Sequence, residues 1–342
     1  MGLVGCGVVG RGLVALLDEK RAFLKERFGF EFEVRFISDY ARGTLVSPQG
    51  IDLAAVLEHL ESSGNIHAMP GARKEPVPLA ELLRESPVDV VCDATPTNYE
   101  TGEPSKGILE AALSSGASAI TCSKGGVGLD LAGLKKLASE RGAELRYESS
   151  VLSGTPLINL VRSAIAGCEV EKVEGIVNGT TNYILTRMES GMDYAEALSE
   201  AQRLGYAETD PTGDVEGFDA AVKVCIMAQE FFGVHLGIAD VDRRGITEVT
   251  ADDVAKAKAE GKRIKLIAGV RRDGSSVSGY VEPRAVELSH PLAGVMNAVN
   301  AACITTDNLG DITIVGPGAG ARETAQGFLA DMLDIARGRE RR

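Results

Sequence analysis

The alternation of apolar and polar positions divides the chain into two halves with different element patterns. In the first 150 residues, short apolar runs bounded by glycine, serine and asparagine alternate with amphipathic stretches. This pattern predicts strands at 2–4, 33–39, 88–94 and 117–122, and helices at 11–27, 53–61 and 105–114. Strands that alternate with helices indicate an α/β arrangement with a parallel sheet. Residues 45–78 show no clear strand and are expected to form an insertion that carries only the 53–61 helix.

The second half of the chain has longer strand patterns with fewer helices between them. Strands are predicted at 171–177, 263–270, 276–288 and 311–315, and helices at 156–166, 193–203 and 321–336. The last three strands have no long helix between them, which favours a mixed or antiparallel sheet. A polar loop, N-G-T-T-N-Y at 178–183, is expected to precede a further helix.

Residues 5–10 fit the pattern G-x-G-x-x-G between the first strand and the first helix. Such glycines permit a tight turn and close approach of the backbone, and the helix N-terminus then faces a pyrophosphate. The pattern alone is weak evidence in a chain with 40 glycines, but its position between strand and helix is the right one. It predicts a dinucleotide site whose contacts in this segment are Gly5, Gly7, Val8, Val9 and Gly10.

Two residues near the second strand favour different cofactors, one NAD and the other NADP. Asp39 ends the second predicted strand, where a carboxylate binds the ribose, and Arg42 could hold a 2′-phosphate. Either side chain could instead be solvated. The loops after the next two strands add Thr95, Pro96 and Lys124 as candidates, because parallel sheets bind ligands at the carboxyl ends of their strands. Lys124, in the loop S-K-G-G, could equally be an exposed turn lysine.

Two further turns carry candidate ligand contacts. The glycine-rich G-P-G-A-G at 316–320, which includes Gly318, opens the terminal helix and faces a phosphate or a nicotinamide, or only makes a close helix–sheet contact. The irregular turn at 148–155 could aim backbone carbonyls at a hard cation, although its spacing alone gives little support for one.

These predictions describe an α/β protein of two domains. Residues 1–148 are expected to form a Rossmann-type dinucleotide-binding domain, completed by the C-terminal helix of residues 316–342. Residues 149–315 are expected to form an α+β substrate and dimerisation domain around a mixed sheet.

The densest chemistry lies between residues 204 and 229. Five carboxylates fall within twelve residues, namely Glu208, Asp210, Asp214, Glu216 and Asp219. Lys223 then stands alone in the apolar run 220–228, where loss of water lowers the pKa of an ammonium, with Asp219 one helical turn earlier. Carboxylates can bind a substrate ammonium, and a tuned lysine can donate a proton. A single Asp/Lys pair of this kind is more often a structural ion pair. The rest of the chain nevertheless favours the catalytic interpretation.

Composition excludes several classes of protein. The 342 residues are 44% apolar and 25% charged, which is typical of a globular chain of about two domains. A formal charge of −13, with no compensating basic cluster, argues against nucleic acid or an anionic membrane as partner. No apolar run approaches the roughly 20 residues of a membrane helix, and no signal peptide is expected. Six scattered cysteines and four isolated histidines favour a reducing cytoplasm and give no zinc spacing.

Three segments closely resemble homoserine dehydrogenases. They are N-G-T-T-N-Y-I-L at 178–185, A-E-T-D-P-T-G-D-V-E-G-F-D-A-A-V-K at 207–223 and G-P-G-A-G at 316–320. The resemblance runs from Gly5 to Arg322, apart from residues 45–78, and its middle segment is close to diagnostic. It implies reversible reduction of L-aspartate 4-semialdehyde to L-homoserine with NADPH or NADH, a step toward threonine and methionine, in a homodimer.

The resemblance also implies roles for individual residues. Lys223 matches the proton donor and Lys124 an active-site position, while Glu208 matches the residue that binds the substrate amino group. Thr180, Asp214 and Asp219 match substrate-pocket positions. A sodium site formed by backbone carbonyls is implied at Glu148, Val151, Ser153 and Thr155. Many relatives carry a regulatory domain or an aspartokinase fusion, and this chain ends after its last helix, so feedback control by threonine through such a domain is not expected.

Two other functions remain open at this point. A phosphorylating semialdehyde dehydrogenase would need a thiolate with a nearby base, and the nearest candidate, Cys122, ends a buried strand without a histidine beside it in the sequence. A non-catalytic NAD(P)-sensing protein would not require a desolvated lysine. Phosphate-independent, aldehyde-dependent oxidation of NAD(P)H distinguishes the first function from both.

Overall fold

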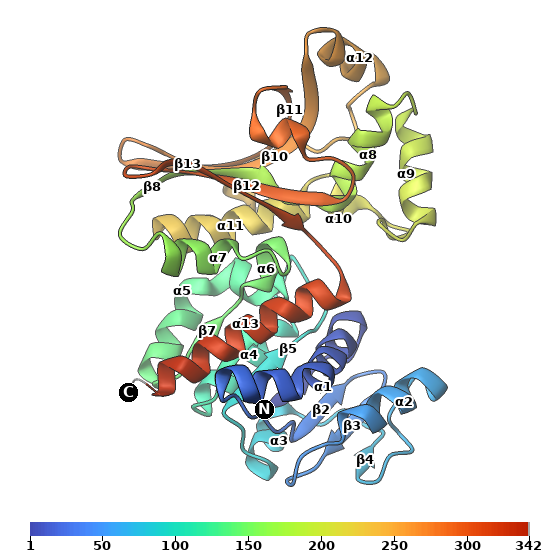
Figure 1. Cartoon of the computed structure of the whole chain (residues 1–342), viewed down its shortest axis with the longest axis vertical. Helices are drawn as coiled ribbons and strands as arrows, with labels where there is room; N and C mark the ends of the chain where they lie inside the picture. The colour runs from blue at the N-terminus through green and yellow to red at the C-terminus, as the bar shows by residue number, and fades with distance from the viewer. Residues whose placement is uncertain (341–342) are drawn as a thin grey trace. The chain divides into compact units, whose positions relative to one another are not determined.

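The computed structural model describes residues 1–340 and divides the chain into two compact units (Figure 1). The first unit comprises Met1–Gly154 together with the chain from Gly320 onward, and the second comprises Thr155–Ala319. The predicted α/β class is therefore confirmed, with one sheet in each unit. Within the described residues, no helix is long and apolar enough to cross a membrane.

The first unit is built on a seven-stranded sheet in the order β4-β3-β2-β1-β5-β6-β7. Its parallel strands are β1 (Gly2–Val4), β2 (Phe36–Asp39), β5 (Val90–Asp93), β6 (Ser118–Thr121) and β7 (Leu145–Arg146). These strands are apolar on both faces because helices cover both, which is why they appear as continuous runs in the sequence. The covering helices are α1 (Val8–Phe28), α3 (Leu79–Glu85), α4 (Ser105–Ser114), α5 (Lys124–Glu140) and α13 (Ala321–Glu340).

The expectation of no strand within residues 45–78 was wrong. β3 (Gly43–Val46) pairs antiparallel with β2, and β4 (Ala72–Arg73) pairs antiparallel with β3. Both strands are too short to give a clear alternation, and β3 falls across the edge of the segment. The predicted helix is present as α2 (Leu53–Ser63), with Asp52 as its N-cap.

The terminal helix α13 packs on α1 inside the first unit (Figure 1). Gly12 permits this approach, since a Cβ atom there would lie 2.6 Å from the carbonyl oxygen of Ala321. Arg322 adds a bidentate ion pair with Glu19 at 2.6 and 2.9 Å. The chain thus returns to the first unit after completing the second.

The second unit contains a six-stranded sheet in the order β13-β12-β8-β10-β11-β9. The strands are β8 (Val170–Ile176), β9 (Asp242–Arg243), β10 (Lys262–Asp273), β11 (Ser276–Glu287), β12 (Val299–Thr306) and β13 (Gly310–Pro317). Only the β9–β11 pair is parallel, so the mixed sheet is confirmed. β12 was not predicted, because the polar residues at both of its ends leave only a short apolar run.

Helices of the second unit pack on this sheet or at its end. They are α8 (Gly179–Glu189), α9 (Tyr194–Arg203), α10 (Thr212–Val215), α11 (Phe218–Phe232) and α12 (Ala251–Ala259). The buried α11 contacts β8, β10 and β11, and α8 contacts β10 and β12. A single helix over 156–166 was wrong: α6 (Ser149–Leu152) precedes a break, and α7 (Leu157–Asn159) continues into a π-helical turn at Leu160–Ala164.

Candidate active site

Lys223 lies in the middle of α11 and forms a buried ion pair. Its Nζ atom is 2.7 Å from Oδ2 of Asp219, four residues earlier, and donates a hydrogen bond to the carbonyl of Val177 at 2.5 Å. Both residues are almost fully buried, with 5% and 6% of their surface exposed. The predicted apolar run around Lys223 is buried throughout, so its ammonium is held by protein groups instead of water.

Asn178 joins the two carboxylates of this cluster. Its side-chain Nδ2 donates to Asp214 Oδ1 at 2.6 Å and to Asp219 Oδ2 at 3.0 Å. Its Oδ1 caps α8 by accepting the amide of Thr181 at 2.9 Å. The segment 178–183 was expected to be a loop ahead of a helix, but α8 begins already at Gly179. Asn178 was not singled out from the sequence, although an asparagine between a strand and a helix is a typical N-cap signal.

The surroundings of Asp214 raise the pKa of its carboxyl. Burial raises the pKa of this carboxyl, the negative charge of Asp219 raises it further, and the hydrogen bond from Asn178 opposes both. Asp214 therefore differs from Asp219, whose charge is balanced by Lys223 at 2.7 Å.

The remaining predicted substrate residues lie on or beside the loop that follows α9. Thr180 donates its hydroxyl to the carbonyl of Tyr206 at 2.6 Å, and the Tyr206 ring lies 4.7 Å from that of Tyr183. Glu208 is exposed, and Gln202 holds its backbone carbonyl at 3.1 Å. The loop backbone is thus fixed by side chains of α8 and α9, while the Glu208 side chain stays at the surface.

The glycine segment of the first unit has the close contacts expected of a dinucleotide turn. Gly5 has φ 88°, and a Cβ atom there would lie 2.6 Å from the carbonyl oxygen of Ala94. A Cβ at Gly10 would lie 2.1 Å from the oxygen of Gly5, whereas a Cβ at Gly7 would meet nothing within 4 Å. Val8, the first residue of the 21-residue α1, is 75% exposed. The turn is therefore packed against the protein at Gly5 and Gly10 and accessible at Gly7 and Val8, which fits a pyrophosphate at the helix N-terminus.

Asp39 and Arg42, treated as alternatives from the sequence, form one ion pair. Arg42 Nη1 is 3.3 Å from Asp39 Oδ1, which also accepts the amides of Ala41 and Arg42. Asp39 Oδ2 accepts the amide of Cys6 at 2.7 Å and so ties the end of β2 to the glycine turn. The charge of Asp39 is therefore partly neutralised at the place where a ribose would lie.

Lys124 was expected in a loop, but it is the first residue of α5 and is half-buried. Its amide donates to the hydroxyl of Thr97 at 3.2 Å, which joins the start of α5 to the loop after β5. Thr95 and Pro96 belong to that same loop. The three residues therefore lie at the carboxyl ends of the adjacent strands β5 and β6.

The two remaining candidate turns are tightly packed. A Cβ at Gly318 would lie 2.0 Å from Cγ of Asn300, and Thr155 donates its hydroxyl to the carbonyl of Pro317 at 3.0 Å. In the turn at 148–155, Glu148, Val151 and Ser153 are buried, and Ser153 has a left-handed φ of 55°. Among residues 1–340, no group of three or more His, Cys, Asp or Glu side chains could hold a metal ion.

Cys122 is a poor candidate for a nucleophile. Burial raises the pKa of its thiol to about 12, and the nearby charge of Asp93 acts in the same direction. The reactive species of a cysteine is the thiolate, which this environment disfavours. This argues against the phosphorylating semialdehyde chemistry that was left open by the sequence.

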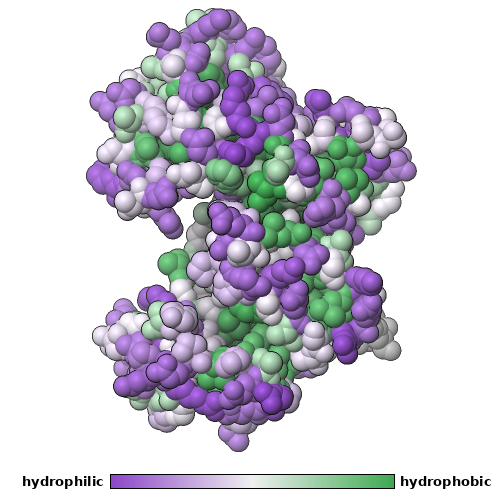
Figure 2. Space-filling model, turned by 180° about the vertical axis from the view of Figure 1, so that it is seen from behind, coloured by the Kyte–Doolittle hydropathy of each residue, from purple (hydrophilic) through white to green (hydrophobic). Residues whose placement is uncertain are grey.

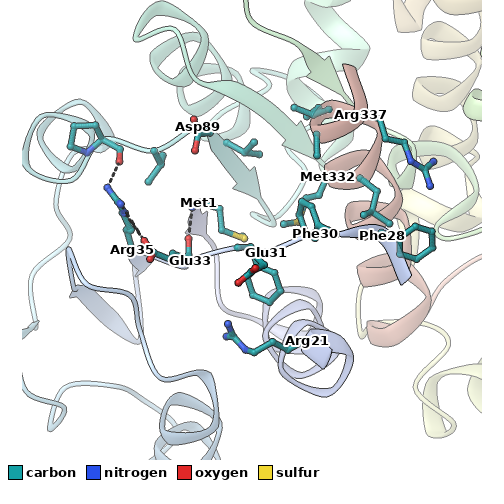
Figure 3. Close-up of a pocket in the computed structure, with 18 residues that line it drawn as sticks. Met1, Arg21, Phe28, Phe30, Glu31, Glu33, Arg35, Asp89, Met332 and Arg337 are labelled. Carbon is teal, nitrogen blue, oxygen red and sulfur yellow. Dashed lines mark hydrogen bonds and ion pairs between the residues drawn. The ribbon is translucent and has the colours of Figure 1, made fainter. Parts of the chain in front are cut away.

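A pocket of about 890 Å³ lies at the amino ends of the parallel strands of the first sheet, opposite to the carboxyl ends that carry Thr95 and Lys124 (Figure 3). Its lining includes Met1, Arg35 and Asp89, which precede β1, β2 and β5 respectively, together with residues of α13. Arg35 is held there by Glu33 and the carbonyl of Pro87, and the Met1 amine donates to the carbonyl of Glu33. Since dinucleotides bind at the carboxyl ends of such strands, this pocket is not the cofactor site.

Comparison with known proteins identifies the family of this chain. A family model described as homoserine dehydrogenase matches residues 156–333, and one described as the NAD-binding domain of homoserine dehydrogenase matches residues 5–148. The chain is 40% identical to an NAD(+)-dependent homoserine dehydrogenase of Pseudomonas canavaninivorans, with 98% of this chain and 95% of the relative covered. It is 38% identical to the homoserine dehydrogenase of Methanocaldococcus jannaschii, with 97% of each covered.

A solved structure gives the same result. A hyperthermophilic archaeal homoserine dehydrogenase in complex with NADPH matches this chain with a TM-score of 0.85 and 30% identity. The match covers 98% of this chain and 97% of that one.

Proposed function

This chain belongs to the homoserine dehydrogenase family, and from that premise we propose which of its residues carry the reaction. The enzyme is an NAD(P)-dependent oxidoreductase that interconverts L-homoserine and L-aspartate 4-semialdehyde. When bound, the dinucleotide would supply the hydride-transfer chemistry of this reaction. The protein must therefore bind both molecules and move one proton at the substrate oxygen.

We propose that Lys223 is the group that moves this proton. In the reducing direction its ammonium donates to the aldehyde oxygen, and in the oxidising direction its amine accepts the proton of the homoserine hydroxyl. The observation that carries this assignment is the buried Lys223–Asp219 pair, with the Val177 carbonyl as a further partner of Nζ. Partners at 2.5 and 2.7 Å hold the Nζ atom in one place, as a positioned acid requires.

The substrate amino group is assigned to Glu208, and Thr180, Asp214 and Asp219 complete the proposed substrate site. Glu208 is exposed on a loop whose backbone is held by Gln202. Its carboxylate forms no ion pair with another residue of the described chain, so it can accept an ammonium directly. Burial raises the pKa of Asp214, which favours a hydrogen-bonding role for this carboxyl over charge pairing.

The dinucleotide is assigned to the first unit. We propose that Gly5, Gly7, Val8, Val9 and Gly10 bind the pyrophosphate, Asp39 and Arg42 the adenosine ribose, and Thr95, Pro96 and Lys124 the remainder, with Gly318 as a further contact. The Arg42–Asp39 pair at 3.3 Å supports acceptance of both cofactors with NADP preferred, because a neutralised Asp39 repels a 2′-phosphate less.

Three broader properties are also proposed. The enzyme would act as a homodimer in the cytoplasm and would bind a sodium ion through the backbone carbonyls of Glu148, Val151, Ser153 and Thr155. Apolar side chains at the surface support association: Val299, Leu309 and Val315 are 37%, 57% and 55% exposed around the edge strand β13, and apolar patches are visible in Figure 2. Six free cysteines support a reducing compartment.

The function is tested by one steady-state experiment with both cofactors. Oxidation of NADPH and NADH is followed with aspartate 4-semialdehyde, with and without phosphate. Turnover that requires aldehyde but not phosphate supports the proposal. Turnover that requires phosphate, or cofactor binding without turnover, would refute it. Light scattering of the same preparation gives the subunit number, and replacing sodium by a bulky organic cation should lower the unfolding temperature.

A further inference from the structure

Asp93 is a buried carboxylate of the first unit that accepts four hydrogen bonds. It is the last residue of β5 and has no exposed surface. Its Oδ1 accepts the amide of Thr95 at 3.0 Å and the hydroxyl of Thr95 at 2.6 Å. Its Oδ2 accepts the hydroxyls of Ser105 at 2.5 Å and Thr121 at 2.7 Å. A carboxylate has about four lone-pair positions, so all of them are occupied by donors.

The position of Asp93 in the sheet gives these bonds their importance. β5 lies between β1 and β6, and the sequence order of the strands reverses at β1 and β5. Open α/β sheets bind ligands at this kind of reversal, outside the carboxyl ends of the strands. The residue after Asp93, Ala94, packs directly against Gly5, because a Cβ atom at Gly5 would lie 2.6 Å from the Ala94 carbonyl oxygen. Asp93 therefore lies beneath the loops that follow β1, β5 and β6.

The hydrogen bonds continue from Asp93 to the start of α5. Thr121 donates a hydrogen bond to Asp93, and its oxygen in turn accepts one from the amide of Ser123 at 2.9 Å. The next amide, that of Lys124, donates to Thr97 in the loop after β5. The two loops that carry Thr95 and Lys124 are thus tied to each other and to a single buried anion.

We propose that Asp93 is a positioning residue for the dinucleotide, which sets the mutual placement of the Thr95–Thr97 loop and the N-terminus of α5. This inference rests on the proposed cofactor role of Thr95 and Lys124. Asp93 itself touches neither cofactor nor substrate. It acts because a carboxylate, with only acceptor positions, forces all three neighbouring hydroxyls to point their protons inward.

The charge on Asp93 is needed for this arrangement. Burial raises the pKa of the carboxyl, and the hydrogen bonds from Ser105, Thr95 and Thr121 oppose that rise. In Asp93→Asn the new amide nitrogen cannot face the Thr95 N–H, which is unable to reverse, so it must face Ser105 and Thr121. Thr121 would then have to accept a hydrogen bond from that nitrogen and turn its own O–H away, so the inward orientation of the hydroxyls would be lost.

The decisive variants are Thr121→Val and Thr121→Ser in the full chain. Dissociation constants for NADPH and NADH are measured by the fluorescence of the bound cofactor, with KM for homoserine and the urea unfolding midpoint measured in parallel. Thr121→Val and Asp93→Asn should weaken cofactor binding about tenfold or more, the range expected for loss of a hydrogen bond to a charged group. Thr121→Ser keeps the hydroxyl and should bind as the unaltered enzyme does, and KM for homoserine should stay within about twofold in all three.

A matched pair of serines separates positioning from stability. Ser105 and Ser118 are both fully buried in the first unit, but Ser118 lies at the amino end of β6, where its hydroxyl accepts the amide of Glu144. Ser105→Ala should weaken cofactor binding, and Ser118→Ala should lower the unfolding midpoint similarly without doing so. The proposal is overturned if Thr121→Val binds cofactor normally, or if Ser118→Ala weakens binding as much as Ser105→Ala.

The Thr121 pair remains decisive even if Asp93→Asn fails to fold. Lys124→Ala tests the underlying cofactor assignment on its own. Normal binding by Lys124→Ala together with weak binding by Thr121→Val would refute the role of Lys124 and leave that of Asp93 intact.

Discussion

Replacing Lys223 by Met should remove turnover and also destabilise the second unit, and these two effects can be separated. The substitution keeps much of the side-chain volume but removes the ammonium that lies 2.7 Å from Asp219. General acid–base catalysis contributes typically 10²- to 10⁴-fold, so kcat should fall by at least about 100-fold, or ~3 kcal/mol of barrier. The dissociation constant for NADPH should not change, because no predicted cofactor contact is altered.

The structural cost follows from what Lys223→Met leaves behind. Asp219 is 6% exposed and would keep the hydrogen bond from Asn178, but its negative charge would lose the ammonium that balances it. Removal of one member of a buried ion pair typically costs about 3–5 kcal/mol, whereas removal of both charges is close to neutral. The double variant Lys223→Met/Asp219→Asn should therefore regain most of the unfolding free energy lost by the single variant. It should not regain activity.

The assay compares kcat for homoserine oxidation with the free energy of urea unfolding for the wild type, both single variants and the double variant. Lys265→Met is a matched control, because Lys265 is also buried in the second unit, where its Nζ bonds Asn182 and the carbonyl of Val295. It should lose stability and keep kcat within about tenfold. The assignment of Lys223 is refuted if its single variant retains more than about a tenth of wild-type kcat, or if the double variant recovers activity along with stability.

Four further substitutions test other parts of the structure. Glu208→Gln should raise KM for homoserine at least about tenfold, the effect of losing a charge-assisted hydrogen bond, with cofactor affinity unchanged; a KM within about twofold of wild type would make the loop structural. Arg42→Ala removes the partner of a 2′-phosphate and leaves Asp39 unneutralised, so titration should show NADP weakened by about 1.5–3 kcal/mol and NAD nearly unaffected. Asp39→Ala should instead weaken NAD, and unchanged affinities in both variants would show that neither residue reaches the ribose. Ion pairs and hydrogen bonds from Tyr280, Lys172 and Arg284 lower the pKa of Glu174 to about 2 despite its burial, so its stabilisation is present above about pH 4.5 and lost as the pH falls toward 2. Glu174→Gln should therefore lose about 3 kcal/mol of unfolding free energy at pH 7, and its difference from wild type should be smaller at pH 3. If the unfolding free energies of the two proteins depend on pH in the same way and coincide, the role of the Glu174 charge is refuted.

The local features of this protein were predictable from its sequence because they depend on residues close together in the chain. Strand and helix periodicity, the glycine turn at 5–10 and the i,i+4 spacing of Asp219 and Lys223 all report burial and backbone conformation over a few residues. The buried run around Lys223 and the mixed second sheet were confirmed for this reason. The weakest predictions fell on short elements, such as β3 and β4, in which two to four residues give no period to detect.

Tertiary structure decided which of the polar residues meet. Asn178 bridges Asp214 and Asp219 across 36 and 41 residues, and Asp93 accepts a hydrogen bond from Thr121 across 28 residues. No periodicity connects such positions, because their distance depends on how strands pair and helices pack. Sequence reasoning had the same limit at shorter range. It treated Asp39 and Arg42 as alternative ribose contacts, whereas the turn after β2 brings them together as an ion pair. The sequence by itself determined the chemical groups available to this enzyme, and only the packing of β5, β6, α8 and α11 decided which of them act together.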